Sequence, residues 1–268
     1  MKLPNSLRAL QHRNFRLFIM GQGTSQIGNW VQLIATSWLV YSLSGSTFML
    51  GLSAFSLQIP MLLITPFAGV LLDRLDVRRV LFATNTLAML QSVVMLALVV
   101  SGRIEAWHIV VGNAVLGFGN AFDAPARQAL ISKLLPNRQE LTNAIALNST
   151  VMNGARFIGP MLGGLITAAF GEVWSFATNC VMRLAVISAL RASQIAPHVN
   201  RQASAGMFRQ LMAGIEYAYG FFPSRCALLL LAVSSFCLQS YASLMPWFAS
   251  ERFHGDSRTL GLLYSSAG

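Results

Sequence analysis

The chain has 268 residues, of which 54% are hydrophobic and only 10% are charged, and its formal net charge is +10 at pH 7. Ordinary soluble domains carry about 25% charged residues, so this composition argues against a water-soluble globular protein and favours one that partners a lipid bilayer. The basic residues stand singly between apolar runs and form no patch, which argues against a nucleic-acid partner. The three cysteines have neither disulfide nor metal-site spacing, so we expect no metal and no cofactor.

Seven apolar runs are long enough to cross a bilayer, for which about 20 helical residues suffice. They cover residues 16–43, 46–72, 79–101, 106–134, 139–170, 172–191 and 224–250, and residues 259–268 resemble the opening of an eighth. The predicted fold class is an all-α integral membrane protein. Its predicted parts are a six-helix bundle over residues 1–192, a cytoplasmic linker with an amphipathic helix (207–219) over 193–223, and the start of a second bundle over 224–268.

The basic residues predict the orientation of these segments. Fourteen lysines and arginines lie in the N-terminal arm and in the connections after the second, fourth and sixth segments, whereas the opposite connections carry three. Cytoplasmic connections of membrane proteins are enriched in Lys and Arg, so we expect the N-terminus to lie in the cytoplasm. Six helices, a long connection and a seventh helix are the layout of a transporter built from two halves. On that layout the chain is a fragment, the product of a truncated gene or a functional half.

The connection after the second segment is the most informative stretch of the chain. It packs charged residues and a glycine into a tight hairpin between two apolar runs: Gly69, Asp73, Arg74, Asp76, Arg78 and Arg79. This pattern resembles the loop between helices 2 and 3 of the major facilitator superfamily. The resemblance implies a gating role for Asp73 and Arg74, with Gly69 allowing the tight turn. Val77 stands where that family usually has a basic residue, for which Arg78 or Arg79 would substitute.

A second motif lies in the fifth segment and contains Arg156, Gly159, Pro160, Gly163 and Gly164. It resembles the Gly-Pro-x-x-Gly-Gly motif of exporters in the same superfamily, in which small residues let two helices approach closely and the proline bends the helix. Residues 25–46, 119–130 and 143–148 resemble the enterobactin-exporter-like branch, the transmembrane secretion effectors. The resemblance implies proton-driven export of a siderophore or an amphipathic drug across the bacterial inner membrane, with a small-molecule substrate and no cofactor.

Ionisable groups at membrane depth are costly and are therefore functional candidates. Asp123 and Arg127 are four residues apart and can pair on one helix face. Asp123 is either a proton-coupling carboxylate or, the interpretation we favour, a structural lock within reach of the loop arginines. Arg156 either meets an anionic substrate or pairs with a group in the fourth segment. Polar residues that would line a central cavity are Gln26, Asn29, Gln58, Asn120, Asn148 and Asn153.

Arg183 is unusual because it falls near the middle of the sixth segment, where relatives are apolar, and no acidic residue lies within one turn of it. The sequence suggests either that its side chain snorkels to the membrane surface or that it is a lesion under relaxed selection. In the second case, leucine at this position would raise the folded yield.

Three functional classes follow from the sequence. The first is the exporter, supported by both motifs and by the fourth segment. The second is a non-transporting remnant, or a half-transporter that needs a partner chain, and the oligomeric state cannot be read from the sequence. The third is a membrane enzyme, which is disfavoured because the chain contains no His-Glu-x-x-His, Gly-x-Ser-x-Gly or P-loop pattern.

Overall fold

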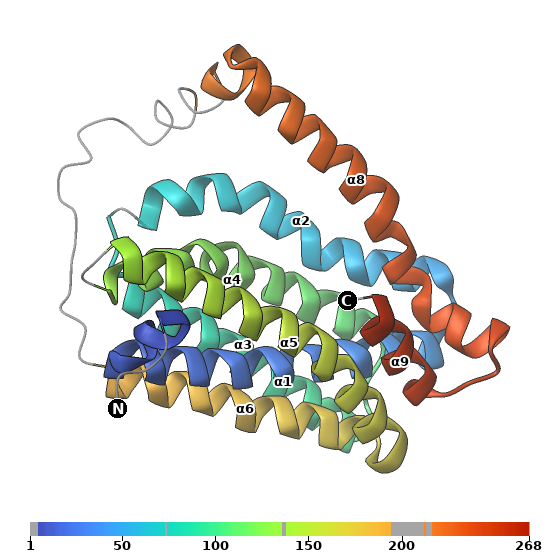
Figure 1. The fold of residues 1–268 in the computed structure, drawn as a ribbon. Coiled ribbons are helices and arrows are strands. Elements are labelled where there is room, and N and C mark those ends of the chain that lie inside the picture. The colour runs from blue at the N-terminus through green and yellow to red at the C-terminus, as the bar shows by residue number, and fades with distance from the viewer. Residues whose placement is uncertain (1–4, 73, 136–137, 194–211, 213–215, 268) are drawn as a thin grey trace.

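The computed structural model describes residues 5–72, 74–135, 138–193, 212 and 216–267. Every regular element within these residues is a helix (Figure 1), which confirms the predicted all-α class. The elements are η1 (Asn5–Gln11), α1 (Arg13–Ser44), α2 (Thr47–Leu72), α3 (Val77–Val100), α4 (Ala106–Lys133), α5 (Arg138–Phe170), α6 (Glu172–Ala192), α8 (Phe222–Trp247), the π-helical turn η2 (Phe248–Arg252) and α9 (Ser257–Ala267).

The bounds of the long helices lie within three residues of the seven predicted segments. Of the predicted amphipathic helix over 207–219, the structure describes Met212 and residues 216–219, and these are helical. Asp73 also lies outside the described residues. The division of the chain near residues 192 and 223 stays a prediction.

Three short connections lie at one end of the bundle, between α1 and α2, α3 and α4, and α5 and α6. Each contains a glycine with positive φ: Gly45 at 59°, Gly102 at 66° and Gly171 at 86°. A left-handed backbone of this kind is strained for residues with a side chain, so these glycines allow the tight turns. Gly69 plays no such part, because it lies inside α2 and ahead of the turn. The prediction that it shapes the hairpin was therefore wrong.

Helix α1 lies at the centre of the arrangement and packs against α5 and α6, while α2 packs on α4, and α3 packs against both α4 and α6. Helix α8 crosses at an angle to the other helices (Figure 1) and touches α1 and α2, and α9 lies along α5. Because α1 and α3 each contact both α4 and α6, these four helices enclose a common interior, and the polar side chains on their inner faces converge there.

The core alternates between apolar and polar along the helices. One apolar cluster, which includes Phe15, Leu81, Leu130 and Leu190, fills the end of the bundle near the N-terminus. A second cluster, with Val40, Met95, Ile109 and Phe176 among its members, fills the opposite end. Between them the same four helices carry buried polar residues, including Gln22, Gln32, Asn85, Asn179 and Arg183. This central polar layer holds the candidate site.

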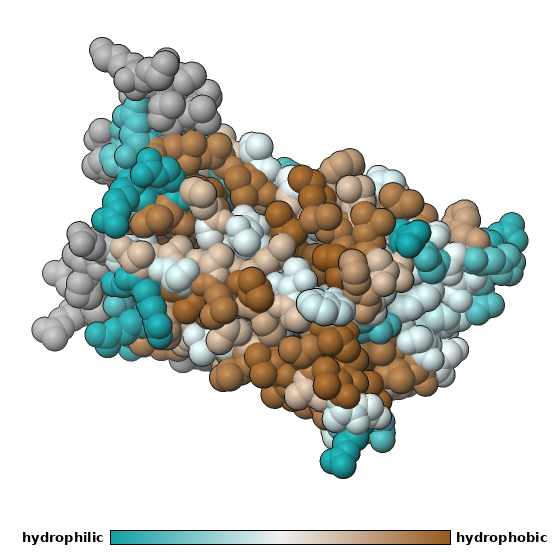
Figure 2. Space-filling view, turned by 90° about the horizontal axis from the view of Figure 1, so that it is seen from below, coloured by the Kyte–Doolittle hydropathy of each residue, from teal (hydrophilic) through white to brown (hydrophobic). Residues whose placement is uncertain are grey.

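The outer surface is apolar across its middle. Figure 2 shows a hydrophobic belt between hydrophilic ends, and exposed large apolar side chains occur on several helices, such as Leu62, Val94, Phe157 and Val181. Within the described residues, α2, α3 and α6 are apolar and long enough to cross a membrane by length and composition alone. Helix α1 is also long, but its glutamines and asparagines, such as the buried Gln22 and Gln32, lower its mean hydropathy. A contiguous apolar belt of this kind is stable in lipid, so the chain is a multi-pass membrane protein.

Candidate functional site

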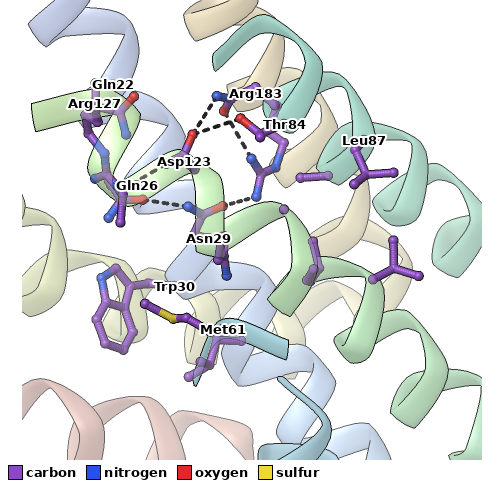
Figure 3. A pocket seen from close by; sticks show the side chains of 18 residues that line it. Gln22, Gln26, Asn29, Trp30, Met61, Thr84, Leu87, Asp123, Arg127 and Arg183 are labelled. Carbon is purple, nitrogen blue, oxygen red and sulfur yellow. Dashed lines mark hydrogen bonds and ion pairs between the residues drawn. The ribbon is translucent and has the colours of Figure 1, made fainter. Parts of the chain in front are cut away.

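A cavity of about 280 Å³ opens within the central polar layer. Its lining comes from α1, α2, α3, α4 and α6: Gln22, Gln26, Asn29, Trp30, Leu33, Met61, Thr84, Asn85, Leu87, Ala88, Val115, Leu116, Gly119, Asn120, Asp123, Ala124, Arg127 and Arg183. Figure 3 shows that its charged groups gather on one side, while Trp30 and Met61 lie together on the other. The cavity is therefore amphipathic, and its volume approaches that of small-molecule sites.

Asp123 is the carboxylate of this cavity, and its two oxygens have different partners. One oxygen accepts hydrogen bonds from the Thr84 hydroxyl at 3.2 Å and from the Asn85 amide at 3.0 Å. The other forms an ion pair with Arg127 at 3.0 Å, one turn along α4. Both side chains are largely buried, with exposed fractions of 15% and 17%. Asp123 thus pairs with Arg127 on one face of α4, as the spacing predicted, and both groups line the cavity.

Arg183 points into the same cavity and is only 7% exposed. Its two terminal nitrogens donate to the side-chain oxygens of Asn29 at 2.6 Å and Asn85 at 3.2 Å. Of the two explanations that the sequence offered for Arg183, snorkelling to the membrane surface does not hold, because α1 and α3 supply partners for its guanidinium inside the bundle. The Asn85 side chain accepts a hydrogen bond from Arg183 and donates one to Asp123, so its amide bridges the two charges.

Only some of the predicted cavity residues line this cavity. Gln26, Asn29 and Asn120 do, and the Asn29 amide also donates to Gln26 at 2.6 Å. The other predicted residues lie away from it. Gln58 on α2 is exposed, as are Asn153 and Arg156 on α5, whereas Asn148 on α5 is half-buried.

The charged hairpin between α2 and α3 holds helix ends together. Asp76 caps α3 by accepting a hydrogen bond from the backbone N–H of Arg78 at 3.0 Å, and it pairs with Arg79 at 3.5 Å. The guanidinium of Arg78 donates to the backbone oxygens of Leu190 at 2.8 Å and Arg191 at 3.1 Å. Arg78 thus satisfies carbonyl groups at the C-terminal end of α6, where a cation also complements the helix dipole.

At position 77 the hairpin places a buried apolar side chain in the cluster near the N-terminus. Val77 occupies that apolar position, and Arg78 binds the end of α6, so the substitution of Arg78 or Arg79 for the family's gating cation stays a prediction. Arg79 pairs with Asp76 and is otherwise 87% exposed. Arg74 is also exposed.

The glycine motif of α5 forms two separate contacts. A Cβ added to Gly159 would lie 2.5 Å from the Trp30 side chain, and one added to Gly163 would lie 2.9 Å from the Val31 backbone. The absence of side chains at both glycines therefore lets α1 pack closely against α5. A Cβ on Gly164 would meet the backbone of Ser257 at 2.5 Å, and one on Gly261 would meet the Pro160 oxygen at 2.5 Å. The motif therefore sets α5 close to α1 on one face and to α9 on another.

A second polar cluster, which the sequence did not reveal, ties α1, α3 and α6 together. Gln32 donates to Gln91 at 2.9 Å and accepts from Ser92 at 2.6 Å and from Asn179. All four residues are buried, so their hydrogen bonds replace those that water would supply. Across the described part of the chain, no group of three or more potential metal-ligating His, Cys, Asp or Glu side chains converges.

A helical bundle that is apolar outside and polar at its centre is the architecture of multi-pass membrane transport proteins. A sequence model of the transmembrane secretion effectors, a family of the major facilitator superfamily, matches residues 5–268. The chain belongs to this family.

Individual relatives agree with that assignment. The staphyloferrin A transporter of Staphylococcus aureus (strain NCTC 8325 / PS 47) is 27% identical over 88% of this chain and 59% of its own length. The multidrug efflux pump Tap of Mycolicibacterium fortuitum is 28% identical over 65% of this chain and 44% of the pump. The macrolide efflux protein A of Streptococcus pyogenes is 22% identical over 65% of this chain and 41% of that protein.

Among solved structures, a mutant of the peptide transporter POT in complex with alafosfalin shares the fold. The TM-score is 0.56 with 14% sequence identity, and the match covers 87% of this chain and 48% of the transporter. The present chain spans about half the length of the curated relatives it matches.

Proposed function

We propose that this chain acts in proton-driven export of a siderophore or an amphipathic small molecule across the cytoplasmic membrane of a bacterium. The observation that carries the proposal is the ionisable pair Asp123–Arg127 in a cavity at the centre of an apolar bundle. Such groups are retained at membrane depth chiefly where they serve a transport path or a proton relay. The names of the relatives, which are a siderophore transporter and two drug exporters, support this class of substrate.

Asp123 is the group that would take up and release the proton. Protonation neutralises the carboxylate, weakens its ion pair with Arg127 and leaves that guanidinium free to face the cavity. Deprotonation restores the pair. Because an inward proton gradient drives export only by exchange, the ligand would bind while Asp123 is deprotonated and paired with Arg127 at 3.0 Å, and would leave before Asp123 takes up the proton. Thr84 and Asn85 hold the other carboxylate oxygen, so the carboxylate keeps its position while its charge changes.

The orientation and layout of the chain belong to the same proposal. The N-terminal arm, the α2–α3 hairpin and the end of α6 lie at one end of the bundle, as the contacts of His12 with Glu140 and of Arg78 with Leu190 support. This end carries most of the basic residues and would face the cytoplasm. Residues 1–192 would form one half of a transporter, 193–223 the linker and 224–268 the beginning of the other half.

Proton exchange in everted membrane vesicles tests the proposal. Vesicles from cells that express the 268-residue chain are energised by respiration, and staphyloferrin A or erythromycin is added while a fluorescent dye reports the internal pH. We expect at least one compound to release protons from the vesicles. Replacement Asp123→Asn should abolish the release, because an amide cannot carry the proton.

Glu216→Gln is the matched control, since it removes a carboxylate that is exposed outside the bundle. It should respond as the unchanged chain does. If folded protein is present in the vesicles and neither compound releases protons, export by this chain is contradicted and the non-transporting alternative is favoured. Release that persists in Asp123→Asn would instead exclude Asp123 as the coupling group.

A further inference from the structure

The charges of the central cavity do not balance, and this imbalance points to the chemistry of its ligand. Resting on the proposed function, we propose that the cavity binds an amphipathic anion, with the guanidinium of Arg183 as its principal contact. The anionic group would lie beside Arg183, and the apolar body of the ligand would lie against Trp30 and Met61.

The first argument is the charge balance. The cavity lining contains one carboxylate, on Asp123, and two guanidinium groups, on Arg127 and Arg183. Asp123 and Arg127 neutralise each other at 3.0 Å. Among the residues that the structure describes, Arg183 hydrogen-bonds to the neutral amide oxygens of Asn29 and Asn85 and forms no ion pair. Among the described residues, the cavity lining therefore carries one positive charge that has no ion-pair partner.

The second argument is the burial of that charge. Only 7% of the Arg183 surface is exposed. Its Nε atom is buried and has no hydrogen-bond partner. The Nε atom of Arg127 is likewise buried and unpartnered. A cation removed from water is poorly stabilised by amide oxygens alone, so an anion that enters the cavity gains a strong charge-assisted contact. Guanidinium donors suit planar anions such as carboxylates in particular.

The third argument is the shape of the cavity. Trp30 and Met61 line the side away from Arg183 (Figure 3). The absence of a side chain at Gly159 makes room for Trp30, since any Cβ there would lie 2.5 Å from the tryptophan Cβ. An anion without an apolar body would make no contact with Trp30 and Met61, whereas an amphipathic anion contacts both these side chains and Arg183. The ligand class is thus an apolar, preferably aromatic, carboxylate or a comparable anion.

Binding of a defined pair of probes tests this inference without any need for transport. The probes are 1-naphthaleneacetate and its uncharged methyl ester. Their binding to the full 268-residue chain in phosphatidylcholine nanodiscs is measured by calorimetry, with empty nanodiscs as the blank. We expect the acid to bind at least tenfold more tightly than the ester, as one buried charge-assisted hydrogen bond permits.

Three variants make the test specific. Arg183→Leu should abolish the preference for the acid, and Arg183→Lys should retain part of it. The control Arg258→Leu removes an exposed arginine at the start of α9 and should change nothing. Equal affinity for acid and ester, or an unchanged preference in Arg183→Leu, would overturn the proposal.

An anionic lipid headgroup offers the same chemistry as a small carboxylate. A repeat in nanodiscs that contain phosphatidylglycerol distinguishes the two sources: competition by the lipid identifies a headgroup as the natural anion, and no competition identifies a free ligand. The binding result is also separable from the proposed function. Charge-selective binding without proton release would support the anion site and contradict export. Proton release without charge-selective binding would support export and contradict the anion site.

Discussion

Arg183 illustrates what a sequence does not reveal about a single residue. Its position near the middle of a membrane segment was plain from the sequence, yet its partners Asn85 and Asn29 lie 98 and 154 residues away. No local pattern joins side chains that are separated so far along the chain. By contrast, the Asp123–Arg127 pair was predictable, because residues four apart in a helix always share a face.

The contacts of Arg78 with the end of α6 predict that this single residue contributes to the free energy of unfolding. Replacement Arg78→Leu removes two hydrogen bonds from a cation to the last carbonyl groups of α6. We expect a loss of about 1–2 kcal/mol in the free energy of unfolding, measured by denaturant unfolding of the purified chain in detergent.

Arg79→Leu is the neighbouring control. Its side chain is 87% exposed and has a single ion pair at 3.5 Å, so its removal should cost less than about 0.5 kcal/mol. Equal losses in the two variants would show that Arg78 does not secure the end of α6.

At the scale of the helix, the sequence predicted where each segment begins and ends but not which way it faces. Runs of apolar residues bounded by charges or glycines set the lengths, and these agree within three residues. The facing direction was harder to predict because lipid and protein core are both apolar, so a membrane helix lacks a single polar face. For this reason Gln58 and Asn153 were assigned to the cavity, although neither lines the pocket of about 280 Å³.

Helix α5 offers the sharpest test at this scale. Gly163→Ala places a Cβ 2.9 Å from the backbone of Val31, so α1 and α5 must separate. We expect a loss of about 1–3 kcal/mol, typical of overpacking, in the same unfolding measurement.

Gly154→Ala is a matched control on the same helix, because a Cβ there meets nothing within 4 Å. It should leave stability unchanged or raise it by up to about 1 kcal/mol through the better helix propensity of alanine. A stable Gly163→Ala variant would mean that the close approach of α1 and α5 is not required.

For the whole molecule, the alternation of basic and non-basic connections predicts the orientation in the membrane. Alkaline phosphatase, which is active only outside the cytoplasm, should be active when fused within the connection at Gly102 and inactive when fused near Asp76. A green fluorescent protein fused at the same positions should show the opposite pattern. Activity of the phosphatase near Asp76 would reverse the proposed orientation.

Asn29 and Asn85, the two amides that hold Arg183, also bear on how the specificity of this cavity can evolve. Asparagine and aspartate codons differ by a single base, so either amide is one point mutation from a carboxylate that would neutralise Arg183 in place. The cavity could then exchange an anionic ligand for a neutral or cationic one without rebuilding the surrounding helices. A family that exports chemically diverse compounds would need few genetic steps to move between them.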